Sequence, residues 1–229
     1  MDRPVTPRAP VIELVGPAGV GKSTILGLLK TQDGLVGRGV WRLPPALLLR
    51  SAVRTLPSWL DLWWRAGTVP WDETKHFVRL DAMFRLLQRP PGTRPHTWLL
   101  DEGPVFVLAW LRAVGREVAG PERLEGWWRN AIARWRGAVD VIVWLDAPNA
   151  VLANRIRARA KPHVLQTWDD GDAWQFLDRF RAAFADTITD LTRGNGGAPE
   201  VVRHRTDLVS RDAIVDDLLR RVNGRLDAR

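Results

Sequence analysis

The 229-residue sequence has no cysteine and no tyrosine, and only four of its 34 basic residues are lysines. The absence of cysteine excludes disulfides and thiolate metal sites, and it fits a reducing compartment. The longest uninterrupted apolar run, Val105 to Leu111, is far shorter than the ~20 residues of a membrane span. The proline-rich first ten residues lack the apolar core of a signal peptide. These absences predict a soluble, cytoplasmic protein without a membrane partner.

Apolar residues make up 45% of the sequence and charged residues 26%, which fits a globular protein with a sizeable core. The length fits one α/β domain with an inserted helical region. The net charge of +8 is interpreted as solvated surface arginine, with attraction of a nucleotide or a nucleic acid as the alternative. Most of the thirteen tryptophans are expected in helix packing, and a few in an aromatic-binding pocket.

Short apolar runs alternate with helical patterns along the chain. We expect strands at 11–15, 97–100, 139–145 and 199–206, and a short one within 34–43. We expect helices at 23–30, 46–88 with breaks near Pro57 and 67–70, 104–114, 121–136, 149–160, 177–191 and 210–223. This alternation predicts an α/β fold with a parallel sheet covered by helices on both faces.

The segment GPAGVGKS at 16–23 matches the phosphate-binding pattern G-x-x-x-x-G-K-[ST], with a predicted strand before it and a predicted helix after it. Its glycines let backbone N–H groups face phosphate oxygens, and the helix adds the positive end of its dipole. Lys22 supplies a charge at the β- and γ-phosphates, and the Ser23 hydroxyl can coordinate Mg²⁺. The pattern predicts an ATP site formed by Gly16, Ala18, Gly19, Val20, Gly21, Lys22, Ser23 and Thr24.

Two carboxylates, Asp101 and Glu102, follow the predicted strand 97–100. In a parallel sheet they would lie beside the phosphate-binding loop, where ligands bind. A carboxylate there can hold Mg²⁺ or accept the proton of an attacking hydroxyl. We assign Asp101 to the metal together with Ser23, and Glu102 to the acceptor as its base. The alternative is that both carboxylates are solvated turn residues.

A third segment, Leu145-Asp-Ala-Pro148, precedes an arginine-rich helix. Arg155 and Arg159 are four residues apart and therefore share one helix face. Guanidinium groups that converge on phosphates can neutralise the charge of the transferring group. The alternative is a basic helix end favoured by the helix dipole.

The phosphate-binding loop, the acidic strand end, L-D-A-P and R-I-R-A-R follow one another in an order that resembles the thymidylate kinase-like and nucleoside kinase-like P-loop kinases. The resemblance implies five parallel strands with the loop strand in the centre. It implies a mobile lid at about 155–170, whose Arg155 and Arg159 grip ATP phosphates, and a helix that offers Arg79 or Arg85 to the acceptor. Residues 1–10 would form a disordered tail. The helical region 44–90, with SWLDLWWR as a cap, would cover the acceptor.

One position departs from that resemblance. Thymidylate kinases have Asp-Arg where this chain has Asp101-Glu102, and a carboxylate there would repel a monophosphate. We therefore expect ATP-dependent phosphate transfer to a hydroxyl of a small nucleoside-like or natural-product acceptor. A nucleoside monophosphate kinase, a polynucleotide 5′-hydroxyl kinase and an ATPase without an acceptor are the alternatives, and a homodimer is left open. Glu13, inside the first strand, is expected to pair with an arginine or to face the active-site end.

Overall fold

The computed structural model describes residues 8–66, 71–89, 97–115, 121–160, 162–194 and 197–227. Its sheet has five parallel strands in the order β2-β3-β1-β4-β5. This confirms the predicted fold, with the loop strand in the centre. The strands are β1 (Val11–Val15), β2 (Leu35–Arg38), β3 (Thr97–Asp101), β4 (Val141–Asp146) and β5 (Glu200–Arg205).

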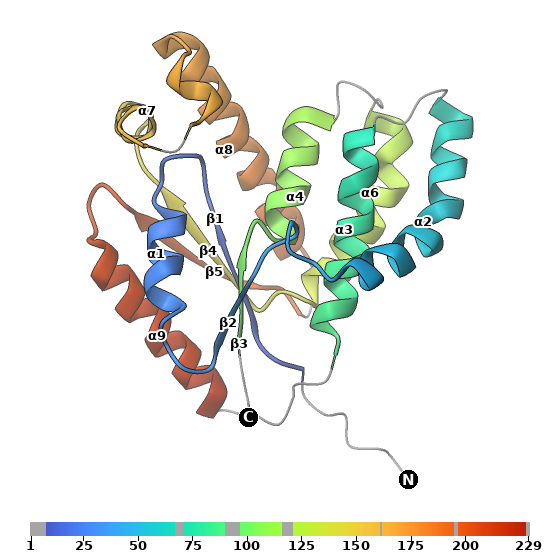
Figure 1. Cartoon of the computed structure of the whole chain (residues 1–229), viewed down its shortest axis with the longest axis horizontal. Helices are drawn as coiled ribbons and strands as arrows, with labels where there is room; N and C mark the ends of the chain where they lie inside the picture. The colour runs from blue at the N-terminus through green and yellow to red at the C-terminus, as the bar shows by residue number, and fades with distance from the viewer. Residues whose placement is uncertain are drawn as a thin grey trace.

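Helices cover both faces of the sheet (Figure 1). On one face lie α1 (Lys22–Leu29) and α9 (Arg211–Asp227). On the other lie α2 (Pro45–Ala66), α3 (Trp71–Leu87), α4 (Pro104–Trp110), α6 (Pro121–Arg136) and α8 (Asp170–Thr192). The π-helical turn η1 (Leu111–Gly115) continues α4, and α7 (Asn149–Arg157) with the 3₁₀ turn η2 (Val164–Gln166) lies between β4 and α8. No helix in the described part of the chain is long and apolar enough to cross a bilayer.

The helix boundaries differ from the prediction at a few places. The expected break at Pro57 is wrong, because α2 runs through this residue. Pro57 is exposed, so water can satisfy the carbonyl group that loses its helical partner. The break expected at 67–70 lies outside the described residues, and α7 ends at Arg157, earlier than expected.

The N-terminal end of the described chain is part of the fold. Arg8 donates to Asp140 at 2.7 Å, and the Asp140 carboxylate also accepts the backbone N–H of Val11. The disordered tail predicted for 1–10 therefore does not extend to residues 8–10, and residues 1–7 lie outside the described part. This ion pair links the start of β1 to the start of β4.

The sheet separates two apolar cores. Alternate residues of the central strand face opposite sides: Val11 and Val15 pack with α3, α4, α6 and α8, whereas Ile12 and Leu14 pack with α1, α7 and α9. Both sides of β1 and β4 are thus apolar, as expected for buried parallel strands. The register pairs Leu14 with Asp101, so the ends of β1 and β3 meet at one edge of the sheet.

Candidate active site

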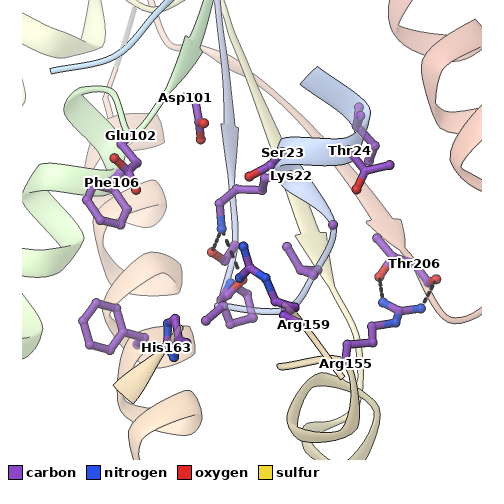
Figure 2. A pocket seen from close by; sticks show the side chains of 18 of the residues that line it. Lys22, Ser23, Thr24, Asp101, Glu102, Phe106, Arg155, Arg159, His163 and Thr206 are labelled. Carbon is purple, nitrogen blue, oxygen red and sulfur yellow. Dashed lines mark hydrogen bonds between the residues drawn. The ribbon is translucent and has the colours of Figure 1, made fainter. Parts of the chain in front are cut away.

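A cavity of about 650 Å³ opens at this edge. The phosphate-binding loop forms its floor, the end of β3 and helices α4 and α8 form one side, and α7 with the chain after β5 forms the other. Most of the predicted site residues, including Lys22, Asp101, Glu102, Arg155 and Arg159, line this single cavity. Figure 2 shows how these side chains lie.

The phosphate-binding loop requires its glycines for a steric reason. Gly16 has a φ of 143°, and a Cβ atom there would lie 2.1 Å from the carbonyl oxygen of Leu145. Gly21 has a φ of 96° and directly precedes α1. A side chain at Gly16 would push the loop away from β4, and the loop's N–H groups would lose their common direction.

The side chain of Lys22 turns back over the loop. Its Nζ donates to the carbonyl oxygens of Gly16 at 2.5 Å and Pro17 at 3.2 Å. Burial lowers the pKa of Lys22 to about 8, although Asp101 and Glu102 act in the opposite direction. Arg159 adds to the lowering, which places this guanidinium within electrostatic reach of Lys22. An anionic phosphate in the cavity would be attracted by both cations.

Asp101 and Glu102 face the cavity from the end of β3 (Figure 2). Glu102 has a φ of +54°, the one positive φ of a non-glycine residue in the described chain. Its carbonyl oxygen accepts the N–H of Val40, which follows β2. A backbone held in this sparsely populated region is typical of functional sites, where the surrounding structure maintains the strain.

Glu13 lies behind these carboxylates and is fully buried. Its carboxyl oxygens accept the N–H groups of Val105 at 3.0 Å and Phe106 at 2.9 Å, in the first turn of α4. Burial raises the pKa of Glu13 to about 8, against these hydrogen bonds. A Cβ atom at Gly103 would lie 2.7 Å from this carboxyl group. Glu13 thus holds the start of α4, whereas the sequence suggested either pairing with an arginine or a position facing the active-site end.

Arg155, in α7, and Arg159, two residues beyond its end, have different surroundings. Arg155 donates to the hydroxyl and the carbonyl oxygen of Thr206, both at 2.9 Å, at the end of β5. Arg159 extends toward Lys22 instead (Figure 2). Both line the cavity, but Arg155 is already held at one side of it, whereas Arg159 reaches over the phosphate-binding loop.

The predicted lid begins as a hydrogen-bonded turn. Gln166 donates to the carbonyl oxygens of Ile156 and Arg159, and its own amide oxygen accepts the N–H of His163. The Nδ1 atom of His163 accepts the N–H of Leu165. These contacts tie the segment after α7 to the end of that helix, and they bring His163 to the cavity.

Aromatic side chains that the sequence analysis did not assign to the site form the wall between α4 and α8. We call this set the aromatic wall, and its members are Phe106, Trp110, Phe176, Phe180 and Phe184. The Phe176 and Phe180 rings lie 4.6 Å apart. Helical periodicity identifies Phe180 and Phe184 as core residues, but it carries no signal that they also border a cavity.

Arg79 and Arg85, the predicted acceptor residues, do not line the cavity. Arg85 donates to the buried Asp81 at 2.7 Å, and Arg134 donates to the same carboxylate at 3.0 Å. This cluster joins α3 to α6. Arg79 lies 4.3 Å from the centre of the Trp41 ring. The position of Arg85 therefore does not support the predicted acceptor role, because its guanidinium group forms an ion pair with Asp81 between packed helices.

No protein-family model and no curated protein matches the sequence. Solved structures do match the fold. Thymidylate kinase from Candida albicans superposes with a TM-score of 0.57 at 13% identity, over 97% of this chain and 94% of that one. Deoxyadenosine kinase from M. mycoides, solved with dCMP and dCDP, gives 0.54 at 10% identity over 93% and 98%.

The YorR protein from Bacillus subtilis, in complex with phosphorylated GDP, gives a TM-score of 0.52 at 14% identity, over 93% of this chain and 95% of that one. Each of these matches spans nearly the full length of both chains compared. They agree with the resemblance of the sequence motifs to P-loop kinases. The chain therefore has the P-loop fold of the nucleoside and nucleotide kinases.

Proposed function

We propose that this protein is an ATP-dependent kinase that transfers the γ-phosphate to a hydroxyl group of an uncharged small molecule. The observation that carries the proposal is the composition of this cavity. Its floor is a complete phosphate-binding loop with Lys22, its edge carries Asp101 and Glu102, and its far side is the uncharged aromatic wall. The fold that the chain shares with nucleoside and nucleotide kinases supports the same reaction.

The donor nucleotide would bind on the side of α1 and α7. Backbone N–H groups of the loop and the Lys22 ammonium would hold its phosphates. Arg155 and the chain after β5, including Thr206 and Val209, line the part of the cavity left for the base. Arg159 would lie over the γ-phosphate, where a guanidinium neutralises charge that develops during transfer.

Mg²⁺ fits the oxygen ligands at this edge. The part of the chain that the structure describes has no group of three or more histidine, cysteine or acidic residues placed to hold a metal ion by themselves. Magnesium in such kinases is held by phosphate oxygens, one hydroxyl and one carboxylate or its water, so no protein cage is needed. The hydroxyl of Ser23 and the carboxylate of Asp101 are the residues that would hold it, and the ion would neutralise phosphate charge.

The acceptor would bind against the aromatic wall. The arginine and lysine side chains that line the cavity come from the loop, from α7 and the residues just after it, and from α9, and none comes from α4 or α8; they are Lys22, Arg155, Arg159 and Arg211. A monophosphate at ~4 Å from the Glu102 carboxylate would be repelled by about 4 kcal/mol at an effective dielectric constant near 20. That energy corresponds to a roughly thousandfold weaker binding of the acceptor. An uncharged acceptor avoids the repulsion and gains apolar contact with the wall.

The reaction then needs one proton acceptor. The Glu102 carboxylate would take the proton of the acceptor hydroxyl as its oxygen attacks the γ-phosphorus. The bond between the γ-phosphorus and the bridging β–γ oxygen breaks, and its electron pair leaves with ADP. Lys22 and Arg159 stabilise the charge on the transferred group and on the leaving phosphate.

The test is ADP release from Mg·ATP over a panel of neutral aromatic alcohols, nucleosides, nucleoside monophosphates and short 5′-hydroxyl oligonucleotides. We expect neutral acceptors to be fastest. Glu102→Arg should slow them and help monophosphates, with Glu102→Gln as the control that removes the base without adding a cation. Equal ADP release without any acceptor would identify an ATPase instead.

A nucleoside monophosphate kinase is the second candidate, and the likeness to thymidylate kinase favours it. In that enzyme class a cation must face the acceptor phosphate. Arg159 would have to make that contact, because it is exposed, lines the cavity and lies beyond the end of α7. Thymidylate phosphorylated faster than every neutral compound would establish this second candidate over the first.

A further inference from the structure

Helix α4 begins without a cap from its own segment. Its N-cap residue, Gly103, has no side chain, and its first helical residue, Pro104, has no N–H group. The next two N–H groups, those of Val105 and Phe106, have no acceptor within the helix, as at any helix start. A serine, threonine, asparagine or aspartate at the N-cap position ordinarily accepts one of them. This position is a glycine, so the acceptor has to come from another part of the chain.

The acceptor is the carboxyl group of Glu13 in the central strand β1, 92 residues away in the sequence. One carboxyl oxygen accepts the N–H of Val105 at 3.0 Å, and the other accepts the N–H of Phe106 at 2.9 Å. The Glu13 side chain is fully buried. A Cβ atom at position 103 would lie 2.7 Å from its carboxyl carbon. A side chain at position 103 and this tertiary cap therefore exclude each other.

Glu102 lies between two fixed points of the backbone. On one side, β3 pairs with β1 up to its last residue, and the carbonyl oxygen of Glu102 accepts the N–H of Val40. On the other side, Glu13 holds the first turn of α4. Only Glu102 and Gly103 connect β3 to α4, so this connection has little freedom. The φ of +54° at Glu102 is the strained conformation that the two fixed points maintain.

We propose that Glu13 is a positioning residue for phosphate transfer, which acts through Glu102 by fixing its distance from the phosphate-binding loop. The inference rests on the proposed function, in which Glu102 takes the proton of the acceptor hydroxyl. Glu13 lies three residues before Gly16, where the loop begins. The strand that carries the donor loop is thus joined by one side chain to the turn that carries the base.

A cap within the segment would not provide this link. A serine at position 103 would complete the first turn of α4, but only apolar packing would then set the distance of that turn from β1. Transfer depends on this distance, because displacement of a reacting group by ~1 Å can cost about 100-fold in rate. Two hydrogen bonds with directional geometry, made in a buried site, restrict such a displacement. Changes at Glu13 should therefore lower turnover and leave nucleotide binding intact.

A double-mutant cycle tests whether Glu13 acts through Glu102. Full-length protein is assayed for single-turnover transfer from Mg·ATP to a saturating concentration of the fastest neutral alcohol or nucleoside of the ADP-release panel. Glu13→Gln places an amide N–H group against a backbone N–H group, and it should lower the rate at least about 10-fold without changing ADP affinity. In the Glu102→Gln background the same change should lower the rate less than about 3-fold, because the positioned base is already absent. An equal loss in both backgrounds, or an equal loss of ADP affinity, overturns the proposal.

Gly103→Ala breaks the same contact from the other side. The backbone at Gly103 is extended, with a φ of −88°, so the added methyl group acts mainly through its clash with the Glu13 carboxyl group. It should reproduce the kinetics of Glu13→Gln, and it decides the cycle if Glu13→Gln does not fold. Thr97→Ala is the control for lost stability, since Thr97 is fully buried at the opposite end of β3 and should not affect the transfer rate.

Amide hydrogen exchange gives a measurement that does not depend on activity. The N–H groups of Val105 and Phe106 should exchange at least about 10-fold faster in Glu13→Gln than in the wild type, while those of β4 stay protected. Faster exchange with an unchanged transfer rate would make Glu13 a cap only and would refute its positioning role. Wild-type turnover of Glu102→Gln alone would instead remove the base from the proposed function, and the positioning role with it, while the exchange result would still stand.

Discussion

The two halves of the cavity are built in opposite ways. The donor half is formed mainly by one continuous segment, 16–24, whose backbone groups and Lys22 would bind the phosphates. Arg155 of α7 and Arg159 just beyond it add to this half. The acceptor half is formed by side chains of α4 and α8, which are separated by more than 60 residues in sequence, and it is aromatic and uncharged. Glu102, Gly103 and Glu13 connect the two halves at the start of α4.

This difference follows from what each half has to recognise. A phosphate presents oxygen atoms that any set of converging N–H groups can bind, so a short loop with fixed geometry is sufficient. An acceptor is recognised by its shape and polarity, so its pocket is built from packed side chains that differ between chains of one fold. Variants of the two halves should therefore change different kinetic constants.

The largest effect is expected in the donor half. Lys22→Ala should lower kcat at least about 100-fold, because the charge on the β- and γ-phosphates is lost in the transition state. Single-turnover transfer from Mg·ATP measures it, with circular dichroism to establish folding. Lys30→Ala, a change at an exposed lysine outside the cavity, is the matched control. A folded Lys22→Ala protein with unchanged turnover would remove the loop from the mechanism.

The next effect tests the acceptor half. Trp110→Ala should raise KM for a neutral acceptor about 10- to 100-fold and leave KM for ATP unchanged, because apolar contact in the wall is lost. Trp174→Ala is the control, since Trp174 lies on α8, is 42% exposed and does not line the cavity. Equal loss of ATP and acceptor binding would contradict the division of the cavity into two halves.

Arg155 and Arg159 test the comparison within the donor half. Arg159→Ala should lower kcat about 10-fold or more with little change in ADP affinity, since its contact strengthens as charge develops. Arg155→Ala should mainly weaken ADP binding, because Thr206 holds this side chain beside the base region. Steady-state kinetics and calorimetric ADP titration separate the two effects. Wild-type behaviour of both variants would mean that these arginines are surface residues.

The smallest effect is a pH dependence of nucleotide binding. Because the pKa of Lys22 is lowered to about 8 in the free protein, Lys22 loses its proton as the pH rises above that value. A bound phosphate favours the charged form, so ADP affinity should be constant below pH 8 and fall by up to about tenfold per pH unit above it. Lys22→Arg keeps its charge and should bind ADP without this decline. Calorimetry between pH 7 and 9 compares the two, and parallel profiles would contradict the assignment.

Strands and helices were largely predictable, because alternating and helical apolar patterns reflect burial directly. The break expected at Pro57 is wrong because α2 packs against α3, and one exposed proline does not outweigh that packing. Arg85 illustrates a second limit. Its partner Asp81 lies one helical turn away in the sequence, but only the approach of Arg134 from α6 makes this aspartate a buried ion-pair centre.

What the sequence determined by itself is the phosphate-binding loop, together with Asp101 at the end of a buried strand. These features are local: glycine conformations, a helix start and a strand end are encoded within a few neighbouring residues. Only the tertiary structure decided which core aromatics border the cavity, that Arg155 and Arg159 diverge, and that Glu13 supports α4. Those features depend on how distant helices pack on the two faces of the sheet, and a spacing pattern in one segment carries no information about the segment that it will meet.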